Sequence, residues 1–302
     1  MARSPDSTRG VLMTRTFFTR PLALLGAALC LLAAVVAGGV GATSAANAAR
    51  PAVTAAGLKL PAAVHAASAK PTIVLVHGAF ADSSGWSSVA GNLMDRGYPV
   101  LAFSNPLRGP IADGDYLRAF LTTIEGPIVL VGHSYGGAVI TNAAEGNPNV
   151  KALVYIAAYA PAEGESVAAA NTLGGGHTAV TEHLAIRPFP GAAPGDADAY
   201  IDPAWFHQLF AQDLSRRQAR FMAATQRPGA LGALVTPSGA PAWDDIPSWY
   251  LVAKQDRIIP PEAERAMAAR AGSTTVEINS SHVAMMSHPG VVTQMILTAA
   301  RS

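Results

Sequence analysis

The stretch that decides the fold is Ile128-Val129-Leu130-Val131-Gly132-His133-Ser134-Tyr135-Gly136-Gly137. Its first four residues are apolar and mostly β-branched, a pattern typical of a strand that is buried on both faces. The sequence G-x-S-x-G follows at once, and a helical pattern continues to Glu145. A serine between glycines at a sharp strand-to-helix turn holds its hydroxyl clear of the sheet. Ser134 is therefore the candidate nucleophile.

Similar apolar runs recur on both sides of this stretch and alternate with helical patterns. Strands are predicted at 72–76, 98–103, 128–131, 150–156, 249–253 and 274–278. Helices are predicted at 84–96, 115–124, 137–145, 261–271 and 289–300. This order favours an α/β fold, with a mostly parallel, doubly wound sheet covered by helices on both faces.

The alternation breaks between about residues 160 and 235. This segment holds three consecutive glycines from Gly174 to Gly176, several prolines, and amphipathic patches at 205–210 and 216–224. A loop of this length without structure of its own is unusual in a compact domain. We therefore expect one domain over 71–302, with a mostly helical cap inserted at about 160–235.

A serine hydroxyl needs a base to take its proton. His282 is the candidate because it lies late in the chain, in a short loop that follows the predicted strand 274–278. His288 is the alternative, but it directly precedes Pro289 at a predicted helix start, where a capping or surface role is expected.

The base in turn needs a carboxylate to fix its tautomer. Asp256 follows the predicted strand 249–253, at the sheet edge where catalytic groups gather. Asp244 and Asp245 precede that strand and so lie at its other end. Glu163 and Glu165 follow an earlier strand and remain the alternative acids.

Two backbone N–H groups should receive the negative charge that develops during acyl transfer. Tyr135, directly after the nucleophile, supplies one of them. The loop after the first strand supplies the other, from Ala79 or, failing that, from Phe80. His77 in the same loop is interpreted as a structural histidine that braces it by hydrogen bonding.

The amino-acid composition argues against nucleic-acid binding and against a cysteine metal site. The chain of 302 residues carries a net charge of +1, so no basic field indicates nucleic acid as a partner. Cys30 is its single cysteine, and it lies within an apolar run from Leu22 to Val40. No cysteine metal site is expected, and the sequence gives no indication of oligomeric state.

The N-terminal residues predict export. Arg15 and Arg20 precede the apolar run, and Ala46-Asn47-Ala48 fits an A-x-A cleavage site. We predict a signal peptide at 1–48, an Ala/Pro-rich leader at 49–70, and a secreted protein with no stable membrane association after cleavage. A retained membrane anchor is the alternative, since the run is nearly long enough to span a bilayer.

Four stretches together carry a family resemblance. They are His77 to Phe80 with Gly85-Trp86, Gly132 to Gly137, Asp256 to Pro260, and Ser281 to Met286. The chain resembles α/β-hydrolases of the plant methylesterase and hydroxynitrile lyase group and their bacterial esterase relatives. This resemblance implies a Ser134–His282–Asp256 triad, an oxyanion hole from Ala79 and Tyr135, a small helical cap over an apolar pocket, and no metal or organic cofactor.

Two positions bear on the reaction type. The lyases of the resembled group carry a threonine where this chain has Gly78, and a lysine where it has Val283. Ester hydrolysis is therefore favoured over hydroxynitrile cleavage. Lactonase, amidase or related chemistry on the same triad, and a non-catalytic small-molecule receptor, remain alternatives.

The expected partner is a small-molecule ester with apolar or aromatic groups. Phe80, Trp86, Met285 and Trp205 are the predicted substrate-binding residues. Aromatic residues of the cap such as Phe206, Phe210 and Phe221 could also close this pocket, although aromatic side chains on a helix are more often a packing face.

Overall fold

The computed structural model describes residues 70–302. The predicted signal peptide, and the leader up to residue 69, lie outside the described residues. Among the helices of residues 70–302, none combines the length and the apolar character needed to cross a membrane.

The core is a six-stranded parallel sheet in the order β2-β1-β3-β4-β8-β9. Its strands are β1 (Thr72–Val76), β2 (Val100–Phe103), β3 (Ile128–Ser134), β4 (Val150–Ala158), β8 (Ser248–Ala253) and β9 (Thr274–Ile278). Strands β1 and β3 are buried along their whole length, as their continuous apolar runs predict. All six predicted strands are present.

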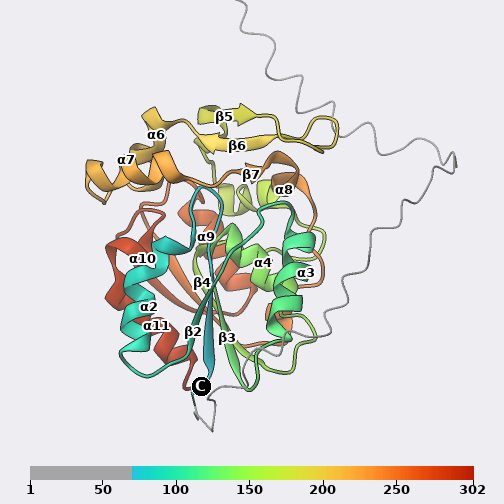
Figure 1. The fold of residues 1–302 in the computed structure, drawn as a ribbon, viewed down its shortest axis with the longest axis vertical. Coiled ribbons are helices and arrows are strands. Elements are labelled where there is room, and N and C mark those ends of the chain that lie inside the picture. Colours follow the sequence, from blue (N-terminus) through green and yellow to red (C-terminus); the bar gives the residue numbers. More distant parts are fainter. Residues whose placement is uncertain (1–69) are drawn as a thin grey trace, which may run out of the picture. The chain divides into compact units, whose positions relative to one another are not determined.

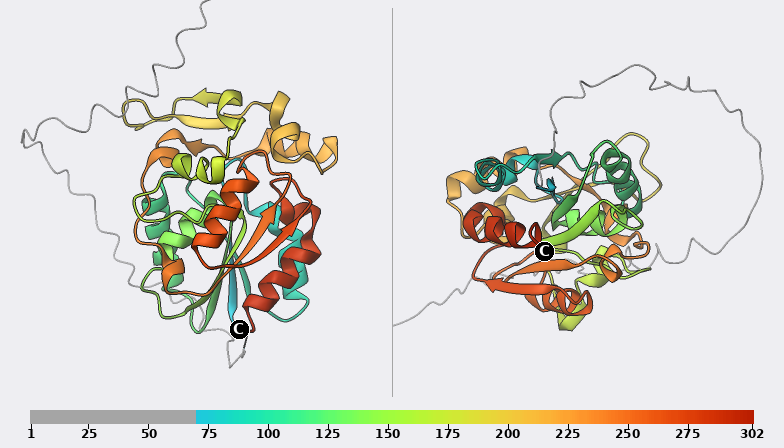
Figure 2. Two further views of the ribbon diagram at one scale, coloured as in Figure 1. Left: turned by 180° about the vertical axis from the view of Figure 1, so that it is seen from behind. Right: turned by 90° about the horizontal axis from the view of Figure 1, so that it is seen from below.

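Helices cover both faces of this sheet, which confirms the doubly wound arrangement (Figures 1 and 2). Helices α2 (Ser87–Met94) and α11 (Pro289–Ala299) pack against each other on one side, and α3 (Pro110–Leu121) and α4 (Tyr135–Ala143) on the other. The remaining core helices are α9 (Pro261–Arg270) and α10 (Ala284–Ser287), and a 3-10 turn spans Ser83–Trp86.

Helix α3 begins five residues before the predicted start at Asp115. Pro110 occupies its first turn, where a missing N–H costs nothing. The carboxylate of Asp113 then accepts the backbone N–H groups of Arg108 and Gly109, at 2.9 Å and 3.2 Å. The Asp113 side chain thus braces the chain that leads into the helix, a contact that the helical pattern alone does not reveal.

The cap lies between β4 and β8, over the carboxyl ends of the core strands (Figure 1). Its helices are α5 (Val167–Ala170), α6 (Pro203–Phe210), α7 (Arg216–Thr225) and α8 (Leu231–Val235), with 3-10 turns at Leu173–Gly175 and Val180–His183. A further 3-10 turn, Ala242–Asp244, precedes β8. Both predicted amphipathic patches form helices, α6 and α7.

The cap also contains an antiparallel sheet that the helical prediction misses. It consists of β5 (Leu184–Arg187), β6 (Asp198–Ile201) and β7 (Gly229–Ala230). These strands have at most four residues, and two of them are only partly buried. Such short, half-exposed strands produce no apolar run, so the sequence gives no signal for them.

Candidate active site

Ser134 ends β3 at a strained turn. Its backbone has φ 54° and ψ −128°, a region that costs a residue other than glycine about 1–3 kcal/mol. The turn is also crowded, since a Cβ atom on Gly136 would lie 2.5 Å from the carbonyl oxygen of Val76. The first turn of α4, which starts directly after Ser134, therefore approaches the end of β1 closely. The glycines of the motif make this close approach feasible.

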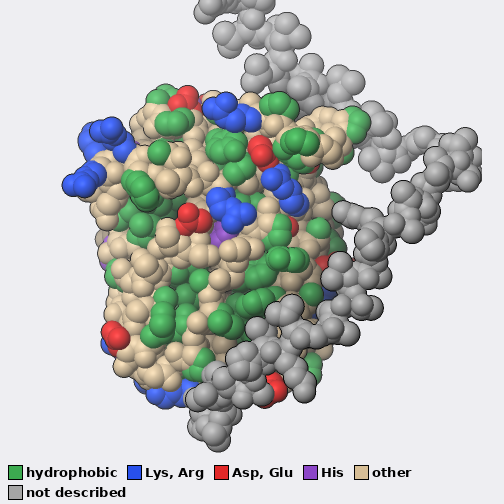
Figure 3. All heavy atoms as spheres, in the orientation of Figure 1, with side chains coloured by type: hydrophobic (Ala, Val, Ile, Leu, Met, Phe, Trp, Pro, Cys, Tyr) green, Lys and Arg blue, Asp and Glu red, His purple; other side chains and the backbone are tan. Residues whose placement is uncertain are grey.

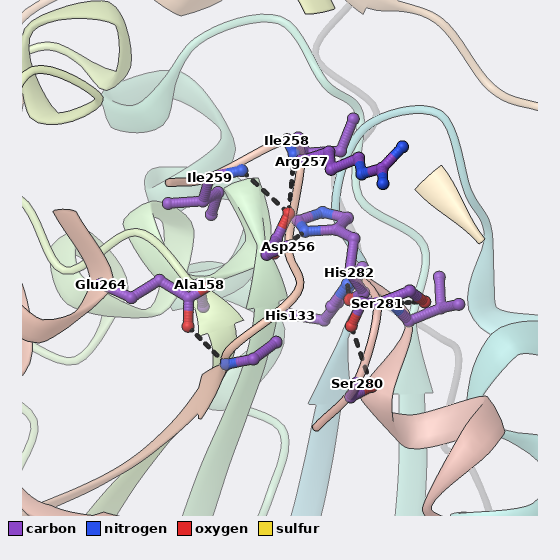
Figure 4. A network of polar contacts seen from close by, with 12 residues as sticks. His133, Ala158, Asp256, Arg257, Ile258, Ile259, Glu264, Ser280, Ser281 and His282 are labelled. Carbon is purple, nitrogen blue, oxygen red and sulfur yellow. Dashed lines mark hydrogen bonds and ion pairs between the residues drawn. The ribbon is translucent and has the colours of Figure 1, made fainter. Parts of the chain in front are cut away.

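His282 and Asp256 form a buried pair beneath the cap (Figure 4). The Nδ1 atom of His282 lies 2.5 Å from Oδ2 of Asp256. The other oxygen, Oδ1, accepts the backbone N–H groups of Ile258 and Ile259, at 2.7 Å and 3.0 Å. Because the carboxylate accepts from Nδ1, the second ring nitrogen of a neutral His282 carries no proton. That nitrogen, Nε2, is buried and has no hydrogen-bond partner among residues 70–302.

His133, the residue before Ser134, holds the backbone of His282. Its Nε2 donates to the carbonyl oxygen of His282 over 2.9 Å, and the two rings lie 4.7 Å apart. Burial lowers the pKa of His133 well below its usual value, and the neighbouring His282 lowers it further. His133 is therefore a neutral donor that attaches the His282 loop to the end of β3, beside Ser134.

The loop after β1 lies directly on Ser134. A Cβ atom on Gly78 would lie 2.5 Å from Cβ of Ser134 and 3.0 Å from its hydroxyl oxygen. The N–H of Phe80 donates to the carbonyl oxygen of Arg227 over 2.8 Å, so it is already occupied. Ala79 is therefore the remaining candidate in this loop to supply an N–H group to the oxyanion hole.

His77 braces this loop, as the sequence interpretation expects. Its Nε2 accepts the backbone N–H of Asn105 at 3.0 Å, so its Nδ1 donates to the carbonyl oxygen of Gly78 at 2.9 Å. Burial lowers the pKa of His77, which keeps the ring neutral.

Tyr135 follows Ser134, and its phenol donates to Asp113 over 2.7 Å, so its ring is anchored at α3.

The alternative base His288 and the alternative acid Glu165 have partners elsewhere, and the other alternative acid, Glu163, is exposed. Glu165 forms an ion pair with Arg270 at 2.6 Å, and Asp244 and Asp245 are exposed ahead of β8. His288 precedes the first turn of α11, where its Nδ1 lies 2.9 Å from the hydroxyl of Ser287. Ser134 ends β3, while Asp256 and His282 follow β8 and β9, so all three lie at the same edge of the parallel sheet.

A cavity of about 340 Å³ lies between the loop after β1 and α7. Its apolar lining residues are Phe80, Ala81, Phe221, Met222, Met285 and Met286. Two of the predicted substrate-binding residues, Phe80 and Met285, are among them. The basic side chains of α7 gather at one end of the molecular face in Figure 3, and one of them, Arg217, also lines the cavity.

The other two predicted substrate-binding residues do not line this cavity. Trp86 is fully buried, with its ring edge-to-face against His133 at 6.3 Å, so it belongs to the core. Trp205 stacks on His183 at 3.8 Å and remains 37% exposed, so it packs on the outside of the cap. Each of these two rings already has a packing partner, and their role in binding substrate stays a prediction.

Phe210, at the end of α6, closes the site from above. Its fully buried ring lies 5.0 Å from the ring of His282 and 6.4 Å from that of Phe80. Ser134 beneath it is only 4% exposed. Ser134 is therefore almost fully shielded from solvent.

Glu264 is a buried acid behind the site that the sequence does not single out. Its carboxyl group is fully buried and accepts the backbone N–H of Ala253 at 2.9 Å, while its other oxygen has no partner within residues 70–302. Burial raises the pKa of Glu264 well above its usual value, and the charge of Asp256 raises it further. Glu264 therefore remains protonated to a higher pH than an exposed glutamate.

This raised pKa predicts how stability depends on pH. The folded protein holds the Glu264 proton above 4.5, where the unfolded chain releases it, so stability falls as the pH rises through the folded pKa. Because Glu264→Gln does not titrate, its melting temperature should fall less than that of the wild type as the pH rises from 4.5 into the alkaline range. Thermal melts across this range test it. Glu262→Gln, exposed on the same helix, is the control, and parallel curves for all three proteins would contradict the prediction.

Within residues 70–302, no group of three or more His, Cys, Asp or Glu side chains could hold a metal ion.

Comparisons with known proteins agree with this fold. The model of the alpha/beta hydrolase family matches residues 73–294, most of the chain. The alpha/beta hydrolase nvfD of Aspergillus novofumigatus is 26% identical over 260 residues, which cover 76% of this chain and 97% of that protein. A carbendazim hydrolyzing esterase of a Nocardioides species is 33% identical over 143 residues, 39% of this chain and 59% of the esterase. The crystal structure of polyneuridine aldehyde esterase superimposes with a TM-score of 0.65 at 20% identity, covering 76% of this chain and 98% of the other.

Proposed function

The chain belongs to the alpha/beta hydrolase family, and on that premise we propose that it is a serine esterase acting on carboxylic esters with apolar or aromatic groups. One observation carries the proposal. The hydrogen bond from Nδ1 of His282 to Asp256 leaves Nε2 without a proton or a partner, at the sheet edge where Ser134 projects from its strained turn. A general base needs an imidazole nitrogen that is free to accept a proton. The hydrogen bond from His133, the residue before Ser134, to the carbonyl oxygen of His282 supports pairing this ring with Ser134.

The proposed reaction proceeds in two acyl-transfer steps. In the first, Nε2 of His282 takes the proton of Ser134 while Oγ attacks the ester carbonyl carbon. The N–H groups of Ala79 and Tyr135 receive the resulting oxyanion. His282 then gives its proton to the alcohol oxygen as the ester C–O bond breaks, which leaves an acyl group on Ser134.

In the second step a water molecule replaces the alcohol. His282 removes a proton from this water as its oxygen attacks the acyl carbon, and returns the proton to Oγ when the acid leaves. Asp256 holds the ring and balances the positive charge that His282 carries in between. Its two backbone N–H partners, Ile258 and Ile259, keep the carboxylate fixed throughout.

The cavity supports the proposed substrate class. Five of the thirteen residues that line it are phenylalanine or methionine, and methionines adapt to irregular apolar groups. Val283, which replaces the lysine of the hydroxynitrile lyases, is fully buried and apolar. These features favour an apolar ester over a substrate that releases cyanide.

Export is part of the same proposal and rests on residues 1–48. An apolar run preceded by arginines and followed by Ala46-Asn47-Ala48 fits a cleaved signal peptide. A secreted enzyme would meet esters from the surroundings, such as aryl esters or synthetic esters. The Nocardioides relative that is named for carbendazim hydrolysis supports testing synthetic compounds of this kind.

A substrate panel tests the proposed function. Purified protein is assayed with p-nitrophenyl esters of increasing acyl length, with aryl esters, and with lactones and amides of matched size, next to Ser134→Ala. We expect hydrolysis of the esters with apolar groups, and no such activity in the variant. Faster hydrolysis of lactones or amides than of any ester would contradict the esterase assignment, and ester hydrolysis that persists in Ser134→Ala would contradict the serine mechanism.

A further inference from the structure

The loop that carries His282 is held by one carboxylate of the cap. Asp213, between α6 and α7, accepts the hydroxyl of Ser281 at 2.5 Å through Oδ1. Its Oδ2 accepts the backbone N–H of Ser281 at 2.8 Å and the hydroxyl of Ser280 at 3.3 Å. Both serines are fully buried and directly precede His282. A single cap side chain thus accepts both the hydroxyl and the N–H of Ser281, the residue before the proposed base. The Ser280 hydroxyl lies closer to the carbonyl oxygen of Ser281, at 2.9 Å.

The charge of Asp213 strengthens these contacts. Partial burial alone would raise the pKa of Asp213, but the hydrogen bonds from the Ser281 hydroxyl and N–H outweigh it and hold the pKa below its usual value. Asp213 is therefore ionised at neutral pH. Hydrogen bonds to an ionised acceptor are roughly twice as strong as neutral ones.

The same cap segment also contacts the loop of the catalytic acid. Gln212 donates through Nε2 to the carbonyl oxygen of Gln255 at 2.5 Å, and Arg257 donates to the carbonyl oxygen of Gln208 at 3.3 Å. Gln255 and Arg257 flank Asp256. Phe210 lies over the ring of His282. Residues 208–213 of the cap therefore contact both the loop that carries Asp256 and the loop that carries His282.

We propose that Asp213 is a positioning residue for His282, so that the seated cap completes the set of contacts that holds the catalytic base in place. The inference rests on the proposed esterase function. Asp213 touches neither the substrate nor the reacting atoms, and it acts through Ser281. When the cap lifts to admit an ester, these hydrogen bonds break, and they form again as the cap closes over the bound substrate.

The core also holds the loop that carries His282. Asp213 can therefore affect the position of His282 without being needed for folding. The backbone N–H of Gln255 donates to the carbonyl oxygen of Ser280 at 3.1 Å, and His133 holds the carbonyl oxygen of His282. Loss of Asp213 would leave the N–H of Ser281 without this acceptor and free the loop to shift at His282. A displacement of 1 Å near reacting atoms can cost about 10²-fold in rate.

The test compares Asp213→Ala with Asp196→Ala. Asp196 is also a cap carboxylate that accepts backbone N–H groups, from Gly232 at 2.8 Å and from Ala197 at 2.9 Å, but its partners lie within the cap. For an ester that the wild type hydrolyses, Asp213→Ala should lower kcat by about 10- to 100-fold and change KM by less than about threefold. Asp196→Ala should stay within about twofold of the wild type in both constants.

Two further variants separate positioning from loss of stability. Asp213→Asn keeps one oxygen for the N–H of Ser281 and can donate to its hydroxyl, so its kcat should lie between those of the wild type and Asp213→Ala. In the double variant Asp213→Ala/Ser281→Ala the loss should be smaller than the product of the two single losses, since both act through one contact. Equal kcat in Asp213→Ala and Asp196→Ala, or losses that multiply, would overturn the proposal.

A spectroscopic measurement decides the matter without any substrate. The proton between Nδ1 of His282 and Asp256 should give a downfield proton NMR signal, which His282→Ala identifies by its absence. This signal should broaden or shift in Asp213→Ala and stay unchanged in Asp196→Ala, and an unchanged signal in both would overturn the proposal. If the wild type shows no hydrolysis that Ser134→Ala removes, the esterase function fails, while the NMR comparison still tests the positioning role.

Discussion

Replacing Ser134 with alanine is expected to lower kcat/KM for an apolar ester by about 10³-fold or more. The variant removes the oxygen that attacks the carbonyl carbon and leaves the rest of the site in place. Because Nε2 of His282 then has no hydroxyl to activate, only binding and the oxyanion N–H groups remain to accelerate hydrolysis. Initial rates over a range of ester concentrations, with active protein quantified for each preparation, measure this loss.

Ser88→Ala provides the matched control for this variant. Ser88 is an exposed serine of α2, on the core surface. Its removal should leave both kinetic constants within about twofold of the wild type. A Ser134→Ala variant that retained more than about a tenth of the wild-type kcat/KM would exclude Ser134 as the nucleophile.

Asp256→Asn is expected to lower kcat by about 10⁴-fold, although it changes only one atom of the carboxyl group. The amide oxygen must face the N–H groups of Ile258 and Ile259, since an NH2 group there would meet two donors. The amide nitrogen then points at Nδ1 of His282. His282 has to accept at Nδ1, which moves its proton to Nε2 and leaves it unable to deprotonate Ser134.

Asp244→Asn is the control for Asp256→Asn. Asp244→Asn, at an exposed position ahead of β8, should not change kcat. Thermal melts should show Asp256→Asn folded, since its side chain keeps its shape and most of its partners. A loss in kcat below about tenfold would mean that Asp256 does not set the tautomer of His282.

The core of the fold could be predicted because its signals are local in sequence. Strands β1 and β3 are buried on both faces, so each appears as a continuous apolar run. Ser134, Asp256 and His282 each follow such a run, and the carboxyl ends of parallel strands meet at one sheet edge. The sequence therefore indicates which side chains gather there without any knowledge of the packing.

The cap could be predicted only in outline, because its contacts depend on how it rests on the core. Nothing near Asp213 in sequence indicates that its carboxylate reaches Ser281, 68 positions further along the chain. Trp86 and Trp205 were assigned to the pocket by their aromatic character, yet each ring packs elsewhere. Glu264 looks like an ordinary helix residue until its burial behind Asp256 is known.

The nucleophile assignment is tested most directly by covalent labelling. The purified protein is treated with a small fluorophosphonate until hydrolysis of a p-nitrophenyl ester stops, then digested, and the modified peptide is sequenced by mass spectrometry. We predict one phosphonyl group per molecule, on the hydroxyl of Ser134, with loss of activity in proportion to labelling. Inactivation with Ser134 unmodified, or full labelling of Ser134 with activity retained, would contradict this account.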